Sequence, residues 1–150
     1  AVALASGIAA GGGRPVYGVY STFIQQVAIV YWDINRLKYV NDTYGHFAGD
    51  QMIVKVAQSI RIALGDAGMA FRYGGDETLA LIPGGTGETA EKMIKTWKQT
   101  LAAVQVDYEI PISAAVGYAI GEHEKLKNVI AEADRNMYAC KHAGRNSTEK

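Results

Sequence analysis

The chain has 150 residues, 49% of them hydrophobic, and its 15 Lys and Arg residues balance 15 Asp and Glu residues. That length suits one ordinary domain with a real core and excludes two full domains joined by a linker. A formal net charge of zero provides no general attraction for polyanions, which argues against non-specific binding of nucleic acid. Phosphate chemistry would therefore depend on a few charges placed locally.

The sequence carries no signal for a membrane or an oxidising compartment. No apolar run approaches the roughly 20 residues that a membrane-spanning helix needs. The apolar start of the chain has no basic region and no cleavage site, so it does not read as a signal peptide. The single Cys140 cannot form an internal disulfide. We expect a cytoplasmic protein without a membrane segment.

Residues 27–32 form a continuous run of β-branched and aromatic side chains, typical of a strand that is buried on both faces. Asp33 and Asn35 end this strand. Apolar residues then recur at helical spacing over 50–64, and Gly65 supplies a stop for that helix.

A β-hairpin is predicted next. Residues 69–73 and 77–82 have the character of strands, and they flank Gly74 and Gly75. A pair of glycines between two such runs predicts a turn with positive φ angles.

The rest of the chain predicts a helix over 88–104, a strand over 110–120 and an amphipathic helix from 126 to near Gly144. The order of elements from residue 27 is β-α-α-β-β-α-β-α. We expect an α/β fold of the α+β sandwich type, with a mixed central sheet flanked by helices.

Two carboxylates stand out by their positions. Asp33 closes the first strand, and Asp76 directly follows the Gly74–Gly75 turn. If the hairpin pairs beside the first strand, both side chains converge at one edge of the sheet, where they would suit Mg²⁺. Taken singly, each has a simpler explanation, Asp33 as a helix cap and Asp76 as a turn residue.

The segment 38–50 is dense in side chains that recognise bases and phosphates. Asn41 offers a donor and an acceptor, and Asp50 can accept from the paired N–H groups of a guanine edge. Lys38 can bind a phosphate as a point charge. The alternative is an ordinary turn, in which Asp50 caps the next helix. Spacing alone leaves both interpretations open.

Lys141 and Arg145 are four residues apart near the end of the last helix, so they share a face if the helix persists that far. They could hold a triphosphate tail. Such a pair more often offsets the dipole at the C-terminal end of a helix.

Three segments in order resemble a known family: residues 33–50, residues 72–77 with the sequence Arg-Tyr-Gly-Gly-Asp-Glu, and residues 133–146. Together they resemble the GGDEF domain of diguanylate cyclases over about residues 27–146. The resemblance implies condensation of two GTP molecules into cyclic di-GMP and two pyrophosphates, with one GTP held by each subunit of an antiparallel homodimer. The implied chemistry is two-metal phosphoryl transfer.

The resemblance also implies a role for individual residues. Asp33, the carbonyl of Ile34 and Asp76 match the ligands of Mg²⁺, or of Mn²⁺ in its place. Glu77 matches the second acidic residue of the signature, implied in metal binding or in activating the attacking 3′-hydroxyl. Asp33, Asp76 and Glu77 are thus the implied catalytic residues.

The implied GTP-binding residues read the guanine, hold the triphosphate or let the nucleotide approach the backbone closely. Asn41 and Asp50 are the implied guanine readers. The implied triphosphate contacts are Lys38, Lys141 and Arg145, and the close approach is at Gly74 and Gly75.

The chain departs from the family pattern at several positions. Thr78 stands where the signature has Phe, and we expect this core-facing position to lose packing as a result. Asn35 replaces the second Asp of the usual Asp-x-Asp. The product-inhibition motif falls on residues 65–68 and is absent, so feedback through it is not expected.

Residues 1–26 lack the usual lead-in of the family and resemble a fragment of the pyrimidine-binding domain of transketolase-type enzymes, particularly deoxyxylulose-phosphate synthase. We therefore expect an atypical or foreign lead-in over 1–26, a GGDEF domain over 27–146 and a flexible tail over 147–150, with no sensor domain in the chain. The leading hypothesis is a diguanylate cyclase. The alternatives are a catalytically impaired GTP-binding module and an engineered hybrid of two proteins.

Overall fold

The computed structural model describes residues 25–104 and 111–148, so the expectations for residues 1–24 lie outside the described residues. Its elements follow the predicted order from β1 onward. Their bounds are β1 (Gln26–Ile34), α3 (Leu37–Tyr44), α4 (His46–Leu64), β2 (Met69–Arg72), β3 (Glu77–Pro83), α5 (Gly87–Val104), β4 (Ala114–Glu122), the short 3₁₀ helix η1 (His123–Lys125) and α6 (Leu126–Thr148).

The four described strands form one sheet in the order β2-β3-β1-β4. Each pair of neighbouring strands is antiparallel. The predicted class, a central sheet flanked by helices, is confirmed. The mixed strand directions that we expected are not found among these four strands, because the apolar pattern of a buried strand does not encode its direction.

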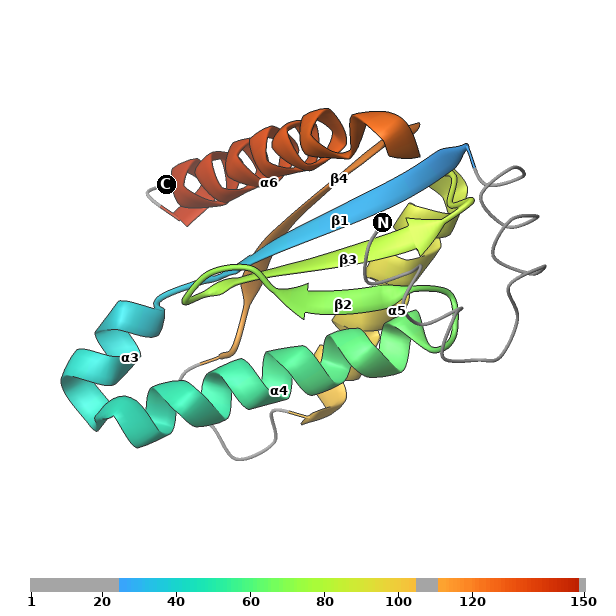
Figure 1. Cartoon of the computed structure of the whole chain (residues 1–150). Helices are drawn as coiled ribbons and strands as arrows, with labels where there is room; N and C mark the ends of the chain where they lie inside the picture. The colour runs from blue at the N-terminus through green and yellow to red at the C-terminus, as the bar shows by residue number, and fades with distance from the viewer. Residues whose placement is uncertain (1–24, 105–110, 149–150) are drawn as a thin grey trace.

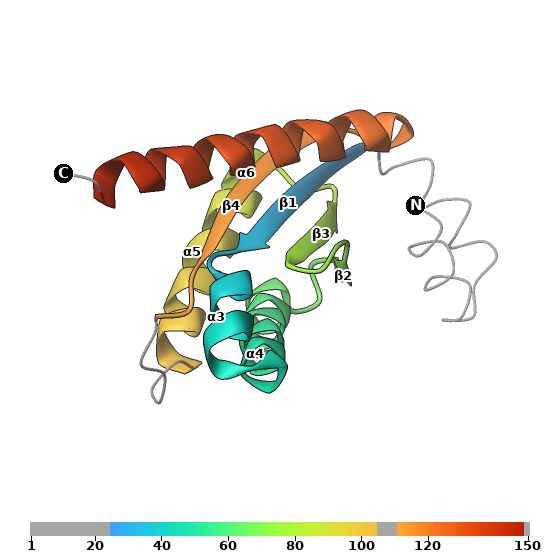
Figure 2. The same cartoon turned by 90° about the vertical axis from the view of Figure 1, so that its left-hand side faces the viewer.

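The sheet separates two apolar layers, with α4 and α5 on one face and α6 on the other (Figures 1 and 2). Side chains alternate along a strand, so β1 contributes to both layers. Val30 and Trp32 pack in the layer of α4 and α5, whereas Ile29 and Tyr31 pack in the layer of α6. This explains why β1 is apolar along most of its length.

The α6 helix lies directly on β4. A Cβ added to Gly117 would lie only 2.1 Å from the backbone nitrogen of Met137, so the close approach requires glycine there. The side-chain amide of Asn136 donates to the Tyr118 carbonyl over 2.8 Å at the same crossing. Gly117 therefore fixes how near α6, and the cations it carries, come to the sheet.

The helix predicted over 50–64 begins earlier, at His46, because a backbone break separates it from α3. Gly45 has a φ of 90°, which only glycine adopts readily, and its N–H donates to the Asn41 carbonyl. The chain changes direction sharply at Gly45, so α3 and α4 meet at a corner (Figure 1).

The turn between β2 and β3 differs from the predicted one. Gly74 and Gly75 are not among the described glycines with positive φ, so the expectation of positive φ angles was wrong. The turn covers residues 73–77, between the paired Arg72 and Thr78, and the Tyr73 N–H donates to the Glu77 carbonyl over 2.9 Å. The longer loop turns the chain without left-handed residues.

Thr78 lies beside a cavity of about 450 Å³ between α4 and the hairpin. It pairs with Trp32 across the sheet and is half-buried. Ile53, Ala57 and Arg61 of α4 line the same cavity. The space at this core-facing position agrees with the expected loss of packing.

Replacing Thr78 with Phe is expected to raise the free energy of unfolding by about 1 kcal/mol, because the ring fills apolar space that is already present. Urea unfolding of the two proteins measures the change. The variant Thr78→Val removes the hydroxyl without adding a ring, and its gain should be smaller. A Phe variant less stable than the parent would show that the cavity cannot take the ring.

Among the described residues, we find no helix with the length and apolar character to span a bilayer.

Candidate active site

Asp33 and Asp76 come together where β1 ends beside the β2–β3 turn. Residue 33 pairs with residue 77 across β1 and β3, and the Ile34 N–H donates to the Asp76 carbonyl over 2.9 Å. The carboxyl end of β1, this turn and the C-terminal end of α6 lie at the same end of the molecule (Figure 1). The pairing of the hairpin beside the first strand is thus as predicted.

The Asp33 carboxylate is buried and makes one strong contact. Lys141 Nζ donates to Asp33 Oδ2 over 2.6 Å, although the two residues are 108 apart in the sequence. Burial raises the pKa of Asp33; the hydrogen bond from Lys141 opposes this, and repulsion from the Asp76 carboxylate adds to it. The Asp33 and Asp76 side chains are therefore close enough to repel each other.

The pair has the character of a site for a hard divalent cation. No described residue donates a hydrogen bond to Asp33 Oδ1, although this oxygen is buried. A buried carboxylate oxygen without a donor, next to a second carboxylate, is relieved by a cation. Asp33 and Asp76 fit such an ion, and Mg²⁺ would keep water and substrate oxygens as its other ligands.

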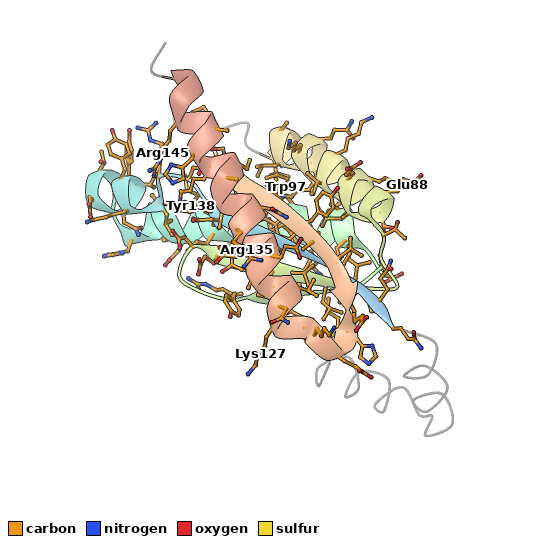
Figure 3. The ribbon with its side chains drawn as sticks, turned by 90° about the horizontal axis from the view of Figure 1, so that it is seen from above. Glu88, Trp97, Lys127, Arg135, Tyr138 and Arg145 are labelled. Carbon is orange, nitrogen blue, oxygen red and sulfur yellow. The ribbon has the colours of Figure 1, made fainter. Side chains whose placement is uncertain are left out.

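A cavity of about 550 Å³ opens beside this pair. It is bounded by the end of β1, the start of α3, the residues before and at the start of β4, and the last turns of α6. Five of the predicted site residues line it: Ile34, Lys38, Asp76, Lys141 and Arg145. Figure 3 shows Arg145 near the C-terminal end of α6, on the side toward α3.

The charged side chains in the wall of this cavity are mostly cationic. Lys38, Lys141 and Arg145 line it, and so does Arg36, which the sequence analysis did not single out. The Arg36 backbone adopts a left-handed conformation with a φ of 63°, and its guanidinium lies 4.7 Å from the centre of the Tyr39 ring. Such a wall beside two carboxylates suits a metal-bound polyphosphate.

Glu77 is not assembled with the acidic pair. Within residues 25–104 and 111–148, no group of three or more His, Cys, Asp or Glu side chains is placed to hold one metal ion. The Glu77 carboxylate lies near the Tyr31 hydroxyl instead: burial raises the pKa of this hydroxyl, and the Glu77 charge raises it further. Tyr31 is therefore placed to orient the Glu77 carboxylate. Tyr31 lies within the apolar run 27–32, and nothing in that run predicts a polar role for it.

Gly74 leaves room for the Glu77 carboxylate. A Cβ on Gly74 would lie only 2.4 Å from Glu77 Oε2, whereas a Cβ on Gly75 would meet nothing within 4 Å. Only the first glycine of the signature is thus required by its neighbours in the described residues.

Replacing Gly74 with Ala is expected to push the Glu77 carboxylate aside. The rate of the GTP turnover expected from the sequence should fall about tenfold or more, with little loss of stability. The cost in stability is small because the displaced atom is the end of a flexible side chain. Steady-state rates and melting temperatures separate the two effects. Gly75→Ala is the matched comparison, and equal rates for the two variants would contradict this role of Gly74.

Arg72 holds the signature turn. Its Nε donates to the Gly74 carbonyl over 3.2 Å and its Nη2 to the Gly75 carbonyl over 2.8 Å. Two bonds from a planar guanidinium fix the direction of both carbonyls. This role of Arg72 was not among the predictions, although its position two residues before Gly74 was a signal for it.

Asn41 and Asp50 lie on adjoining helices and do not line the cavity. A Cβ on Gly49 would lie 1.8 Å from Asn41 Oδ1, so the Asn41 side chain covers Gly49, next to Asp50. Asn41 is half-buried and Asp50 is exposed. The structure thus groups these two residues at the corner between α3 and α4, outside the cavity that the cations line.

Asn35 has a structural partner. Its side-chain amide donates to Ser113 Oγ over 2.9 Å, and its N–H donates to the Ser113 carbonyl over 2.8 Å. These bonds tie the end of β1 to the segment before β4.

Comparison with known proteins gives consistent results. The family described as diguanylate cyclase, GGDEF domain, matches residues 21–147. The bifunctional diguanylate cyclase/cyclic di-GMP phosphodiesterase MucR of Pseudomonas aeruginosa is 34% identical over 128 residues, which is 81% of this chain and 18% of MucR. Diguanylate cyclase A of Treponema denticola is 29% identical over 127 residues, 81% of this chain and 34% of that protein.

Solved structures agree with the fold. The GGDEF domain of DgcB from Caulobacter crescentus, solved in complex with c-di-GMP, matches with a TM-score of 0.73 and 25% sequence identity, over 80% of this chain and 74% of that one. The chain spans between 18% and 34% of the two curated relatives named above. The family match covers most of the chain, from residue 21 to residue 147. The chain therefore belongs to the GGDEF family.

Proposed function

We propose that this domain is a diguanylate cyclase, which joins two GTP molecules into cyclic di-GMP and releases two pyrophosphates. The observation that carries the proposal is the cavity where Asp76, Lys38, Lys141 and Arg145 meet beside the buried Asp33. Membership of the GGDEF family supports the same reaction.

In this proposal Asp33, Asp76 and the Ile34 carbonyl hold the divalent cation, Mg²⁺ or Mn²⁺. The cation supplies charge neutralisation for the phosphates when it is bound. Lys38, Lys141 and Arg145 hold the triphosphate, so that its α-phosphate lies beside the acidic pair. Catalysis then depends on position and charge, because phosphoryl transfer needs little covalent help from the protein.

The guanine would lie at the corner between α3 and α4. Asp50 accepts from the paired N–H groups of the guanine edge, and the Asn41 amide completes the recognition. Asn41 and Asp50 do not line the cavity of the cations, and this supports the division, because a nucleotide triphosphate is long enough to reach from that cavity to a neighbouring site.

Glu77 is proposed to accept a proton. The 3′-oxygen of one GTP bonds to the α-phosphorus of the other as pyrophosphate leaves, and the 3′-hydroxyl proton passes to Glu77. Each GTP must attack the other, and the cavity of one chain suits one triphosphate. A homodimer with two facing cavities is therefore part of the proposal.

A second candidate is a domain that binds GTP without turning it over. The cavity beside Thr78 favours it, because a loosely packed hairpin would hold Asp76 and Glu77 less firmly. Residues 27–146 are proposed as the nucleotide-binding domain in both cases, with 1–26 as an atypical lead-in. GTP as substrate makes the cytoplasm the proposed location.

Incubation of the protein with GTP and Mg²⁺, followed by chromatography and mass spectrometry, tests the proposal. Cyclic di-GMP and pyrophosphate should appear in a ratio of about one to two, and the specific rate should rise with protein concentration as dimers form. GTP binding without product at high protein concentration would select the second candidate. Absence of GTP binding would overturn both.

A further inference from the structure

The ion pair between Lys141 and Asp33 places a protein cation on the acid that the proposed metal needs. The ammonium lies 2.6 Å from Asp33 Oδ2, and the two side chains are 22% and 12% exposed. We propose that Lys141 is an exchangeable cation. It neutralises Asp33 while the site holds no metal, and it moves to the triphosphate when a divalent cation replaces it.

Without a metal ion, the acidic pair requires another cation. Asp33 is buried, and repulsion from Asp76 raises its pKa further. Buried like charges are costly unless an opposite charge compensates them. Lys141 is the one cation with an ion pair to Asp33 in the described part of the chain.

Lys141 and a divalent cation cannot share Asp33 without strong repulsion. A metal bound to this carboxylate would lie within a few ångströms of the ammonium, in a site where burial reduces screening. Asp33 Oδ1 receives no hydrogen bond from a described residue, so it keeps its lone pairs for a cation. The divalent ion then displaces Lys141 from Asp33, because the ion also binds Asp76.

The displaced ammonium has a place to go. Lys141 lines the same cavity as Lys38 and Arg145, which are the other proposed phosphate contacts. Its long, flexible stem lets the charge move into that cavity without any movement of α6. Metal entry thus releases a phosphate-binding cation, and this couples metal binding to nucleotide binding.

The exchange predicts opposite effects of one substitution. Lys141→Met keeps the stem but removes the charge, so a bare metal ion no longer competes for Asp33. The same variant lacks a phosphate contact once the metal is bound. A purely structural ion pair would weaken both kinds of binding when it is removed. The identity of the phosphate ligand rests on the proposed function, but the competition for Asp33 does not.

Titration with Mn²⁺ alone, followed by the electron paramagnetic resonance of the free ion, tests the first half. We expect Lys141→Met to bind Mn²⁺ about tenfold more tightly than the parent, and Lys141→Arg to remain near the parent. Lys127→Met is the matched control, because it removes the same charge from the far end of α6 (Figure 3) and should change nothing. Unchanged or weaker Mn²⁺ binding by Lys141→Met, or no Mn²⁺ binding by either protein, would overturn the exchange.

Binding of 3′-deoxyguanosine triphosphate at saturating Mg²⁺ tests the second half. This nucleotide lacks the attacking hydroxyl, so binding is measured without turnover. We expect Lys141→Met to bind it about tenfold more weakly than the parent. Equal affinity, or no binding to the parent, would overturn the transfer of Lys141 to the phosphates. Neither measurement uses cyclase activity, so a protein that shows both shifts and makes no cyclic di-GMP would refute only the proposed function.

Discussion

Replacing Asp33 with Asn is expected to lower the rate of GTP turnover by at least about a thousandfold while the protein stays folded. Asn keeps the shape of the side chain but has no charge to hold a divalent cation beside Asp76. Burial already raises the pKa of Asp33, so the neutral side chain is not costly to bury. Steady-state rates with GTP and Mg²⁺ measure the loss, and circular dichroism checks the fold.

The matched control is Asp66→Asn, which makes the same chemical change at an exposed position after α4. Its rate should equal that of the parent. An Asp33→Asn protein that retains most of the parental rate would show that the acid at the end of β1 does not hold the metal.

Replacing Gly117 with Ala is expected to cost about 3 kcal/mol of stability, which is the largest structural effect of any single methyl group that we anticipate. The added Cβ would lie 2.1 Å from the Met137 backbone nitrogen, and a backbone atom in the middle of a helix cannot turn aside. Helix α6 must move away from β4 or the strand must distort. Urea unfolding measures the loss.

Gly144→Ala is the comparison for this test, because a Cβ at Gly144 would meet nothing within 4 Å. Alanine is favoured over glycine within a helix by up to about 1 kcal/mol, so this variant should be as stable as the parent or more so. A Gly117→Ala protein with parental stability would show that α6 does not lie on the sheet as described.

The apolar pattern predicted the elements well where one side of an element faces the core. The helix predicted over 88–104 is found as α5, and its Met93, Trp97 and Leu101 are buried at helical spacing. The strand over 27–32 is buried throughout. These predictions succeed because burial repeats with the period of the element.

Other features depend on partners that are distant in sequence. The bond between Lys141 and Asp33 joins residues 108 apart, and no local spacing encodes it. The turn at Gly74 is held by Arg72 and by backbone bonds, so the glycines did not need positive φ angles. The start of α4 was placed late because residues 46–48 precede the apolar repeat.

Contacts between residues distant in sequence also limited the prediction of the site. The resemblance selected residues that the structure brings to one cavity, namely Ile34, Lys38, Asp76, Lys141 and Arg145. It did not separate Glu77 from the acidic pair, because strand pairing places residue 77 beside Asp33, while the Glu77 charge acts on the Tyr31 hydroxyl. Side-chain packing, which the local sequence does not encode, decides which of its neighbours the Glu77 carboxylate approaches.

A crystal structure with Mn²⁺ and 3′-deoxyguanosine triphosphate tests most directly whether the two acids and the cations serve one ligand. We expect anomalous density for manganese between Asp33 and Asp76, a triphosphate in the cavity, and Lys141 on a phosphate oxygen. Manganese bound elsewhere, or an intact Lys141–Asp33 pair beside the bound nucleotide, would contradict this expectation.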